Sequence, residues 1–330
     1  MKLLINIPAY NEEKRLQKTL QKLPRRVTGF KLVKIQVIND GSTDQTKQIA
    51  LKNKVDFLYS NHINRGLGIT FRKAALNALN NDFDVLVNID ADGQFNPDDI
   101  PKLTAPIIAK QADIVIGSRF SGIKPINMPI SKKMINRYGS KMVGYFVHEK
   151  TPDLTCGFRA YNRESLLRLN LSHQFTYTQE TIIDALSKKL KVKWLPVQVR
   201  YFAKRKSKMT KSPINFIFQS ILIIIKTIRD SQPLKFFGLP ALGMIIASFT
   251  IFITVFSQYL YNFYYYDTLK LSPFRTWIGL GSILLLAGIQ FLILAFLADM
   301  IKSNRKLNED EIYEQRKFRF DMNKNNHKNN

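Results

Sequence analysis

Two long apolar runs near the end of the chain constrain it more than any other feature. Residues 236–261 contain no charged side chain, and a second such run covers about 277–298. At about 1.5 Å of rise per residue, each run is long enough to cross a hydrocarbon core of about 30 Å as a helix. Two buried core helices are the alternative, but helices of globular domains seldom lack a polar stripe over about 20 residues. We therefore expect a pair of transmembrane helices within residues 235–301.

Positive charge is concentrated on both sides of this pair. Lys and Arg outnumber Asp and Glu by 50 to 25, and the stretch between Asp184 and Asp230 contains no acidic residue. Basic residues keep to the cytoplasmic side of a membrane, so we expect an integral membrane protein with both termini and residues 1–211 in the cytoplasm. The basic stretch adjoins the apolar runs, which indicates an anionic membrane surface as a partner and no nucleic acid.

Two shorter segments flank the pair. Residues 212–232 include the apolar stretch Ile214–Ile228, which is too short to span a membrane comfortably. We expect this segment to form a helix on the membrane surface, with a third span as the alternative. Residues 302–330 are basic and polar, and we expect a cytosolic, partly disordered tail there.

Residues 1–211 alternate β-branched runs with segments of helical spacing. The expected strands are Leu3–Ile7, Lys34–Ile38, Val55–Tyr59, Val85–Ile89 and Ile114–Ile116. Such alternation predicts an α/β domain with a mostly parallel sheet. Ligands of these sheets bind at the carboxyl ends of the strands, so the residues that follow each strand are the first candidates for a site.

Two carboxylates follow the fourth expected strand directly. Asp90 and Asp92 are two residues apart, a spacing that places both side chains on the same side of an extended chain. A carboxylate pair without sulfur or imidazole nearby suits a hard divalent cation that keeps positions open for phosphate oxygens. The pattern therefore predicts Mg²⁺ or Mn²⁺ as a cofactor. Ordinary turn and helix-capping chemistry is an adequate explanation for the polar residues after the first two strands.

Six motifs in a fixed order carry a family resemblance. They are PAYNEE (8–13), VINDGSTDQT (37–46), NRGLG (64–68), DADGQFNPDDI (90–100), GSRF (117–120) and TCGFRAY (155–161). Together they resemble family 2 glycosyltransferases with the GT-A fold, and more closely the dolichyl-phosphate mannose synthases and bacterial undecaprenyl-phosphate glucosyltransferases. The resemblance covers about residues 3–211. It implies an α/β GT-A domain with a mostly parallel sheet, followed by an interfacial helix and two transmembrane helices.

The resemblance also implies a reaction. A metal-dependent, inverting enzyme of this type transfers one sugar from a nucleotide-sugar donor to the phosphate of a membrane polyprenyl phosphate. UDP-glucose is slightly favoured as the donor over GDP-mannose, and either undecaprenyl or dolichyl phosphate fits as the acceptor. Homo-oligomerisation through the membrane helices is compatible with the sequence. The chain lacks the Gln-x-x-Arg-Trp motif of processive polysaccharide synthases, which favours a single transfer.

The same resemblance assigns roles to individual residues. The nucleotide-binding positions are Pro8, Ala9, Tyr10, Glu12, Asp40 and Asp90. The metal-binding positions are Asp90, Asp92 and Gln94. The positions for the acceptor phosphate are Arg119, Arg137, Arg159, Arg205 and Lys208. Catalytic roles are implied for Asp92 and Arg119. The segment Arg205–Lys208 departs from the family's Gly-x-Ser-Lys pattern, which weakens the assignment of Lys208.

Two other functions stay open at this point. A family 2 transferase acting on a glycan or glycolipid hydroxyl would need a carboxylate base near the acceptor, and Asp153 and Glu180 are the candidates. A degenerate, membrane-anchored scaffold would be expected to have lost the metal carboxylates, which this chain retains. A lipid phosphate is already ionised at neutral pH and needs no strong base, so the basic residues favour the phosphate acceptor.

Overall fold

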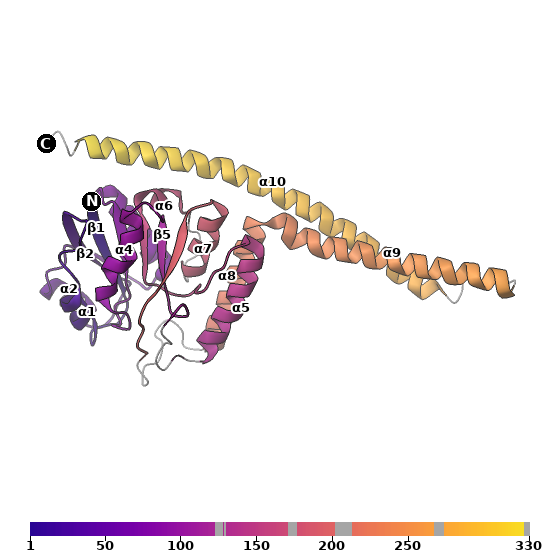
Figure 1. Cartoon of the computed structure of the whole chain (residues 1–330), viewed down its shortest axis with the longest axis horizontal. Helices are drawn as coiled ribbons and strands as arrows, with labels where there is room; N and C mark the ends of the chain where they lie inside the picture. The colour runs from indigo at the N-terminus through magenta and orange to yellow at the C-terminus, as the bar shows by residue number, and fades with distance from the viewer. Residues whose placement is uncertain (123–127, 129, 171–176, 202–212, 267–273, 327–330) are drawn as a thin grey trace. The chain divides into compact units, whose positions relative to one another are not determined.

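The chain folds into two compact units. A computed structural model describes residues 1–122, 128, 130–170, 177–201, 213–266 and 274–326 (Figure 1). The first unit consists of Met1–Thr227 together with Glu309–Asn330, and the second consists of Ile228–Asn308. The unit that contains the six motifs is therefore built from both ends of the chain.

A seven-stranded sheet forms the centre of the first unit. Its order is β3-β2-β1-β4-β6-β5-β7. The strands are β1 Lys2–Ala9, β2 Leu32–Asn39, β3 Phe57–Ser60, β4 Val85–Asn88, β5 Ile114–Ser118, β6 Arg159–Asn162 and β7 Val192–Pro196. Among these described strands, β6 alone runs antiparallel to its neighbours β4 and β5. The sheet confirms the α/β class with mostly parallel strands.

The central strands are buried on both faces, as parallel strands usually are. Leu3, Leu4 and Ile5 of β1 are all fully buried. A row of buried amides crosses this apolar core: Asn6 pairs in register with both Gln36 of β2 and Asn88 of β4. The Gln36 Nε2 donates to Asn6 Oδ1 at 2.8 Å, and Asn6 Nδ2 donates to Asn88 Oδ1 at 2.6 Å. Each side-chain amide hydrogen-bonds to the next, so burial of these polar groups destabilises the core little. The hydrogen bonds also fix the register of the three strands.

Helices cover the sheet and connect its strands. They are α1 Leu16–Lys22, α2 Thr46–Lys52, α3 Leu67–Asn80, α4 Ile100–Ile108, α5 Ile130–Val147, α6 Arg163–Arg168, α7 Thr178–Ser187 and α8 Pro213–Ser231, with a 3₁₀ turn at Pro97–Asp99. Helix α1 packs against α2, α3 against α6, and α5 against α7. Helix α8 accounts for residues 213–231 of the expected surface segment 212–232, and the placement of this helix on a membrane stays a prediction.

Two long helices make up most of the second unit. They are α9 Pro233–Tyr266 and the first part of α10 Arg275–Asn326, and both are long and apolar enough to cross a membrane by length and composition. Within this unit Ser248 Oγ of α9 donates to the Gly281 carbonyl of α10 at 2.7 Å. A Cβ on Gly288 would lie 2.7 Å from Ile245, so glycine allows close approach of the two helices there.

The end of the chain is helical as far as Asn326. Helix α10 continues without a break to Asn326, and its part from Glu309 onward belongs to the first unit. Residues 302–330 were expected to form a partly disordered tail because they are polar and basic, and residues 327–330 of that tail lie outside the described residues. Contacts with the first unit explain the helix, since the side chains that make them recur on one helical face.

Candidate active site

Two loops at the carboxyl ends of β1 and β2 hold one another in place. The Asn11 amide donates to Ser42 Oγ at 2.9 Å, and the Thr43 amide donates back to Asn11 Oδ1 at 2.9 Å. The Glu12 amide donates to Thr46 Oγ1 at 2.8 Å. The motifs PAYNEE and NDGST therefore form one clasped surface, as their positions after neighbouring strands predict. The polar residues of these turns act as more than helix caps, because side-chain oxygens of each loop accept hydrogen bonds from backbone amides of the other.

Asp40 anchors a third loop to this surface. Its carboxylate is 4% exposed and accepts from Asn61 Nδ2 at 2.6 Å, from the Arg65 amide at 3.0 Å and from the Gly66 amide at 2.8 Å. Gly66 has a φ of 89° and immediately precedes α3, where a left-handed residue suits glycine. The structure thus places Asp40 below the surface, where it positions the NRGLG loop.

The predicted metal carboxylates lie in a tight turn directly after β4. Asp92 Oδ1 accepts from the Gln94 amide at 2.9 Å, and both carboxylates are half-buried. Helix α1 holds the backbone of this turn, because Thr19 Oγ1 donates to the Ala91 carbonyl at 3.0 Å and Arg15 Nη1 to the Asp92 carbonyl at 3.3 Å. The carboxylates are therefore fixed through the backbone beneath them.

Gly157 makes room for the first of these carboxylates. A Cβ at Gly157 would lie 2.9 Å from Asp90 Oδ1 and 3.2 Å from Asp90 Oδ2, and the first distance is shorter than real Cβ atoms show. The Gly157 carbonyl accepts from Asn88 Nδ2 at 3.1 Å and from the Tyr177 hydroxyl at 3.1 Å. The amide row of the sheet thus ends at the backbone that supports Asp90. Gly157 stands inside the motif TCGFRAY, but the sequence alone predicted no role for it.

The residues of this turn fit a hard divalent cation. Asp90, Asp92 and the Gln94 side chain offer oxygen ligands only, and the cradle at Gly157 leaves one carboxylate uncrowded. Across the part of the chain that the structure describes, groups of three or more His, Cys, Asp or Glu side chains able to hold a metal are absent. A cation here would therefore take its remaining ligands from a bound diphosphate and water.

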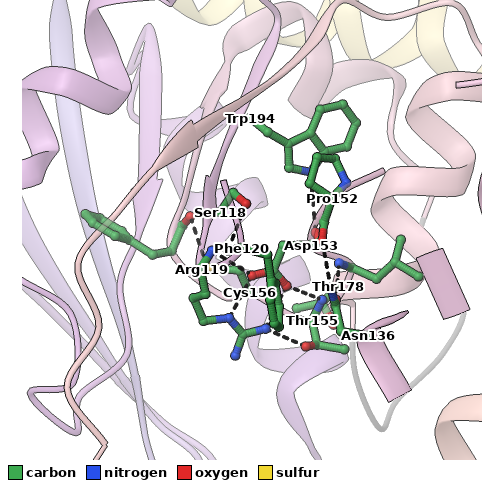
Figure 2. Close-up of polar contacts among 12 residues, drawn as sticks. Ser118, Arg119, Phe120, Asn136, Pro152, Asp153, Thr155, Cys156, Thr178 and Trp194 are labelled. Atoms are coloured by element: carbon green, nitrogen blue, oxygen red, sulfur yellow. Dashed lines mark hydrogen bonds and ion pairs between the residues drawn. The ribbon is translucent and has the colours of Figure 1, made fainter. Parts of the chain in front are cut away.

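Arg119 was expected at the acceptor phosphate, but it lies in the interior (Figure 2). Its Nε and Nη2 donate to the two oxygens of Asp153, both at 2.7 Å, and its Nη1 donates to the Tyr201 hydroxyl at 2.8 Å. Burial lowers the pKa of Arg119, but the charge of Asp153 outweighs this effect and holds that pKa above its ordinary value. Arg119 is therefore a permanent cation that neutralises a buried carboxylate.

Arg159 is also fully buried. Its Nε donates to the Cys156 carbonyl at 2.7 Å, its Nη2 to the Leu154 carbonyl at 3.2 Å and its Nη1 to Thr181 Oγ1 at 2.5 Å. Its guanidinium thus holds the segment before β6, which includes Gly157, rather than the surface expected of a phosphate ligand. Sequence position could not separate this role from phosphate binding, because arginine suits both.

The structure distributes the other predicted positions between surface and interior. Pro8 and Ala9 are buried at the end of β1, Glu12 is 6% exposed, and Tyr10 is half-buried. Because β1 pairs with β4, these residues lie beside the Asp90 turn. Arg137 is exposed on α5. Arg205 and Lys208 lie outside the described residues.

Comparison with known proteins assigns the chain to a family. The glycosyl transferase family 2 model matches residues 5–169, and the chain belongs to this family. An undecaprenyl-phosphate mannosyltransferase of Micrococcus luteus is 34% identical over 176 residues, covering 52% of this chain and 70% of the relative. A UDP-N-acetylglucosamine–dolichyl-phosphate N-acetylglucosaminyltransferase of Methanococcus voltae is 29% identical over 243 residues, covering 66% and 94%.

A solved structure agrees on the fold. Glucosyl-3-phosphoglycerate synthase of Mycobacterium tuberculosis, in complex with Mn²⁺, UDP-glucose and phosphoglyceric acid, superposes with a TM-score of 0.55 and 17% identity. The match covers 70% of this chain and 79% of that enzyme. The GT-A-like fold predicted from the motifs is thereby confirmed.

Proposed function

We propose that this chain is a membrane-bound glycosyltransferase that transfers one sugar from a nucleotide sugar to the phosphate of a polyprenyl phosphate. Relatives named as undecaprenyl-phosphate and dolichyl-phosphate sugar transferases support this general reaction. Helices α9 and α10 would anchor the enzyme in the membrane that contains its acceptor, with the catalytic domain and both termini in the cytoplasm. The charge pattern on either side of the apolar runs supports that orientation.

The observation that carries the proposal is the state of Asp153. A hydroxyl acceptor needs a carboxylate base, and Asp153 was one of two candidates. Asp153 is fully buried, and its oxygens accept the Arg119 side chain, the Arg119 amide at 3.0 Å and the Thr155 amide at 3.1 Å. Both oxygens of this carboxylate are therefore bonded to groups of the interior, away from a solvent-borne acceptor. The other candidate, Glu180, is 3% exposed in the first turn of α7.

A phosphate acceptor removes the need for a base. An ionised phosphate oxygen attacks the anomeric carbon, the bond from that carbon to the nucleoside diphosphate breaks, and the configuration inverts. No proton has to move, because the attacking oxygen is already an anion at neutral pH. Arg137 on the exposed face of α5, with Arg205 and Lys208, would orient the incoming lipid phosphate.

The donor side would be held by the clasped loops and the Asp90 turn. Pro8, Ala9, Tyr10 and Glu12 would bind the nucleotide, while Asp40 positions the loop beside them. Asp90, Asp92 and Gln94 would hold Mg²⁺ or Mn²⁺, which when bound offsets the charge that develops on the departing diphosphate. Mn²⁺ together with UDP-glucose in the complex of the structural neighbour supports a divalent cation here.

The identity of the transferred sugar is the part of this proposal that experiment has to decide. We favour UDP-glucose over GDP-mannose as donor, but the relatives are named for different sugars, mannose in one and N-acetylglucosamine in the other. Sugar hydroxyls are discriminated by individual hydrogen bonds from the loops around the donor. The experiment therefore has to compare donors directly.

The test is a lipid-extraction assay on the detergent-purified full chain. The protein is incubated with undecaprenyl or dolichyl phosphate, Mg²⁺ or Mn²⁺, and separately labelled UDP-glucose, UDP-N-acetylglucosamine and GDP-mannose. We expect label in the organic phase with one donor, and loss of that label with EDTA. Release of nucleotide without labelled lipid would instead favour a hydroxyl acceptor, and no turnover of any donor would favour the scaffold.

A further inference from the structure

A chain of buried polar side chains crosses the sheet of the first unit and ends beside the turn that follows β4. Its middle is the row of Gln36, Asn6 and Asn88 described above. Asn77 of α3 extends the row at one end, because its Nδ2 donates to Gln36 Oε1. Tyr59 of β3 closes that end, where its hydroxyl donates to Asn77 Oδ1 at 2.6 Å. The four amides are at most 7% exposed, so the chain of hydrogen bonds lies within the core.

The other end of this chain is a closed triangle of hydrogen bonds around the Gly157 carbonyl. Asn88 Nδ2 donates to this carbonyl at 3.1 Å and to the Tyr177 hydroxyl at 2.8 Å. The Tyr177 hydroxyl donates in turn to the same carbonyl at 3.1 Å. Burial raises the pKa of Tyr177 well above its ordinary value, and the charge of Asp90 acts in the same direction, so the hydroxyl keeps the proton that it donates. Both lone pairs of the Gly157 oxygen are therefore in use.

The backbone on either side of this carbonyl is held as well. The Cys156 carbonyl accepts from Arg159 Nε at 2.7 Å, and the Phe158 carbonyl accepts from the Gly117 amide at 2.9 Å. Gly157 has no side chain that could fix its position by packing. Its place in the structure therefore depends on hydrogen bonds to the backbone.

The position of Gly157 determines how much room the Asp90 carboxylate has. A Cβ on this glycine would lie 2.9 Å from Asp90 Oδ1, so the carboxylate packs directly against the Gly157 backbone. A small shift of that backbone would change where the carboxylate oxygens lie. Metal sites are sensitive to such shifts, because the groups behind the ligands set the orientation of the ligands.

The packing of Tyr177 separates the role of its ring from that of its hydroxyl. The ring stacks on Phe71 with the ring centres 4.2 Å apart and the planes 2° from parallel. The Arg159 guanidinium lies 5.7 Å from the centre of the same ring. Phenylalanine would keep both contacts, and apolar groups of the same shape can replace buried hydrogen-bonded partners at little cost in stability. The polar chain therefore needs an explanation other than filling the core, and the contact with Asp90 supplies one.

We propose that Asn88 and Tyr177 are positioning residues for the Asp90 turn: they hold the Gly157 carbonyl so that the Asp90 carboxylate keeps the place in which it binds a divalent cation. This inference rests on the proposed function for the presence of a cation at Asp90. Neither positioning residue has to touch the cation or a substrate, so the effect of both should pass through Gly157.

The test measures Mn²⁺ binding to the detergent-purified full chain by calorimetry, with no nucleotide or acceptor present. Tyr177→Phe removes the hydroxyl at the Gly157 end of the polar chain. Tyr59→Phe is the matched control, since it removes a tyrosine hydroxyl from the far end, where Asn77 Oδ1 still accepts from Asn81 Nδ2 at 2.8 Å. Gly157→Ala, alone and combined with Tyr177→Phe, shows whether the hydroxyl acts through this glycine.

We expect Tyr177→Phe to weaken Mn²⁺ binding about fivefold, less than the loss of a group that contacts a metal ligand directly, because the hydroxyl acts through one more contact. Tyr59→Phe should leave Mn²⁺ binding unchanged. In the Gly157→Ala background the Asp90 side chain is already displaced, so adding Tyr177→Phe should change the affinity by less than about twofold. Urea unfolding of each preparation shows whether the variant is folded.

Equal Mn²⁺ affinity in Tyr177→Phe and Tyr59→Phe would overturn the proposal, and so would the same loss from Tyr177→Phe in both glycine backgrounds. If Tyr177→Phe does not fold, Asn88→Ser takes its place, because the shorter side chain removes one partner from the Gly157 carbonyl, and the same two outcomes decide. Absence of Mn²⁺ binding in the unsubstituted protein would also refute the inference. A failure to label lipid would instead remove the polyprenyl phosphate acceptor, and the Mn²⁺ comparison would still decide the role of Asn88 and Tyr177.

Discussion

Asp90 and Asp153 are both carboxylates beside the same motif, yet the structure uses them in opposite ways. Asp90 lies half-buried at the end of β4, next to a glycine that leaves its oxygens uncrowded. Asp153 is fully buried and paired with Arg119 through two hydrogen bonds of 2.7 Å. The first arrangement suits a ligand that arrives from solution, and the second suits permanent internal neutralisation.

The difference shows that charge alone does not identify a functional group. A buried ion pair is held because each partner would be costly to leave alone, so its members are not available for a substrate. The Asp90 turn lies at the end of a strand and its backbone carbonyls are held by the side chains of Arg15 and Thr19. Arg119 and Arg159, which were expected at the acceptor phosphate, are instead buried and bonded to groups of the interior.

Removal of a donor-side carboxylate should have the largest effect on activity. We expect Asp92→Ala to lower sugar transfer about a thousandfold, because the charge on the departing diphosphate loses its compensation. Asp92 is half-buried and its Oδ1 accepts from the Gln94 amide within the same turn, so we expect the folded structure to persist. The amount of labelled lipid formed measures the loss of transfer, and urea unfolding of the same preparation measures whether the variant is still folded. Metal-dependent turnover retained in this variant would contradict the role of the Asp90 turn.

Removal of an acceptor-side carboxylate should instead reduce stability. Asp153→Ala leaves Arg119 buried without its partner, and we expect a loss of about 3 kcal/mol in the free energy of unfolding. Trp194 Nε1 donates to the Asp153 carbonyl at 3.4 Å, so its fluorescence reports this region during urea unfolding. The matched control is the double variant Arg119→Met with Asp153→Leu, which should recover most of the loss. A stable but inactive Asp153→Ala protein would show that Asp153 acts in the reaction.

A methyl group beside Asp90 should disturb the metal site more than the fold. In Gly157→Ala the new Cβ meets the end of the Asp90 side chain, which has to rotate away. We expect Mn²⁺ binding to weaken about tenfold, measured by calorimetry, with little change in unfolding. Gly139→Ala is the control, because its Cβ would meet Leu154 and Ile224 at 3.2 and 3.3 Å, away from the carboxylates. Equal Mn²⁺ affinity in the two variants would remove Gly157 from the site.

The smallest expected effect is on the pH dependence of stability and comes from Cys156. It tests whether water is excluded from the interior around this thiol. Burial, reinforced by the charge of Asp153, raises the pKa of the Cys156 thiol to about 12. An unfolded chain would ionise this thiol near pH 8.5, so stability should fall as the pH rises above that value. Between pH 8 and pH 9.5 we expect a loss of about 1 kcal/mol that Cys156→Ala lacks. Identical pH profiles for the two proteins would place the thiol in contact with water.

Local sequence signals predicted the parts of the fold that depend on neighbouring residues. The alternation of strands and helices, the two apolar runs and the carboxylate pair after β4 all follow from spacings of a few residues. The pairing of Arg119 with Asp153 joins positions 34 residues apart, and no local pattern announces it. The contact between Tyr313 and Glu164 spans 149 residues, and the local composition around Tyr313 predicted only a basic, partly disordered tail.

Glycine and arginine were the hardest residues to interpret from sequence. Gly157 stands within a motif, but only the position of Asp90 shows why a side chain is excluded there. Arg159 matches a family position and is basic, yet its three nitrogens hold backbone and hydroxyl oxygens of the interior. In both cases the deciding information is a three-dimensional neighbour.

Two acceptors that differ by one group separate a phosphate acceptor from a hydroxyl acceptor in a single experiment. Full-length protein is given its labelled nucleotide sugar and divalent cation with either a polyprenyl phosphate or the corresponding polyprenol. Because the structure neutralises Asp153 and an ionised phosphate needs no base, we predict labelled lipid with the phosphate and none with the alcohol. Label on the alcohol at a comparable rate would refute the phosphate acceptor, since it would require a general base on the acceptor side.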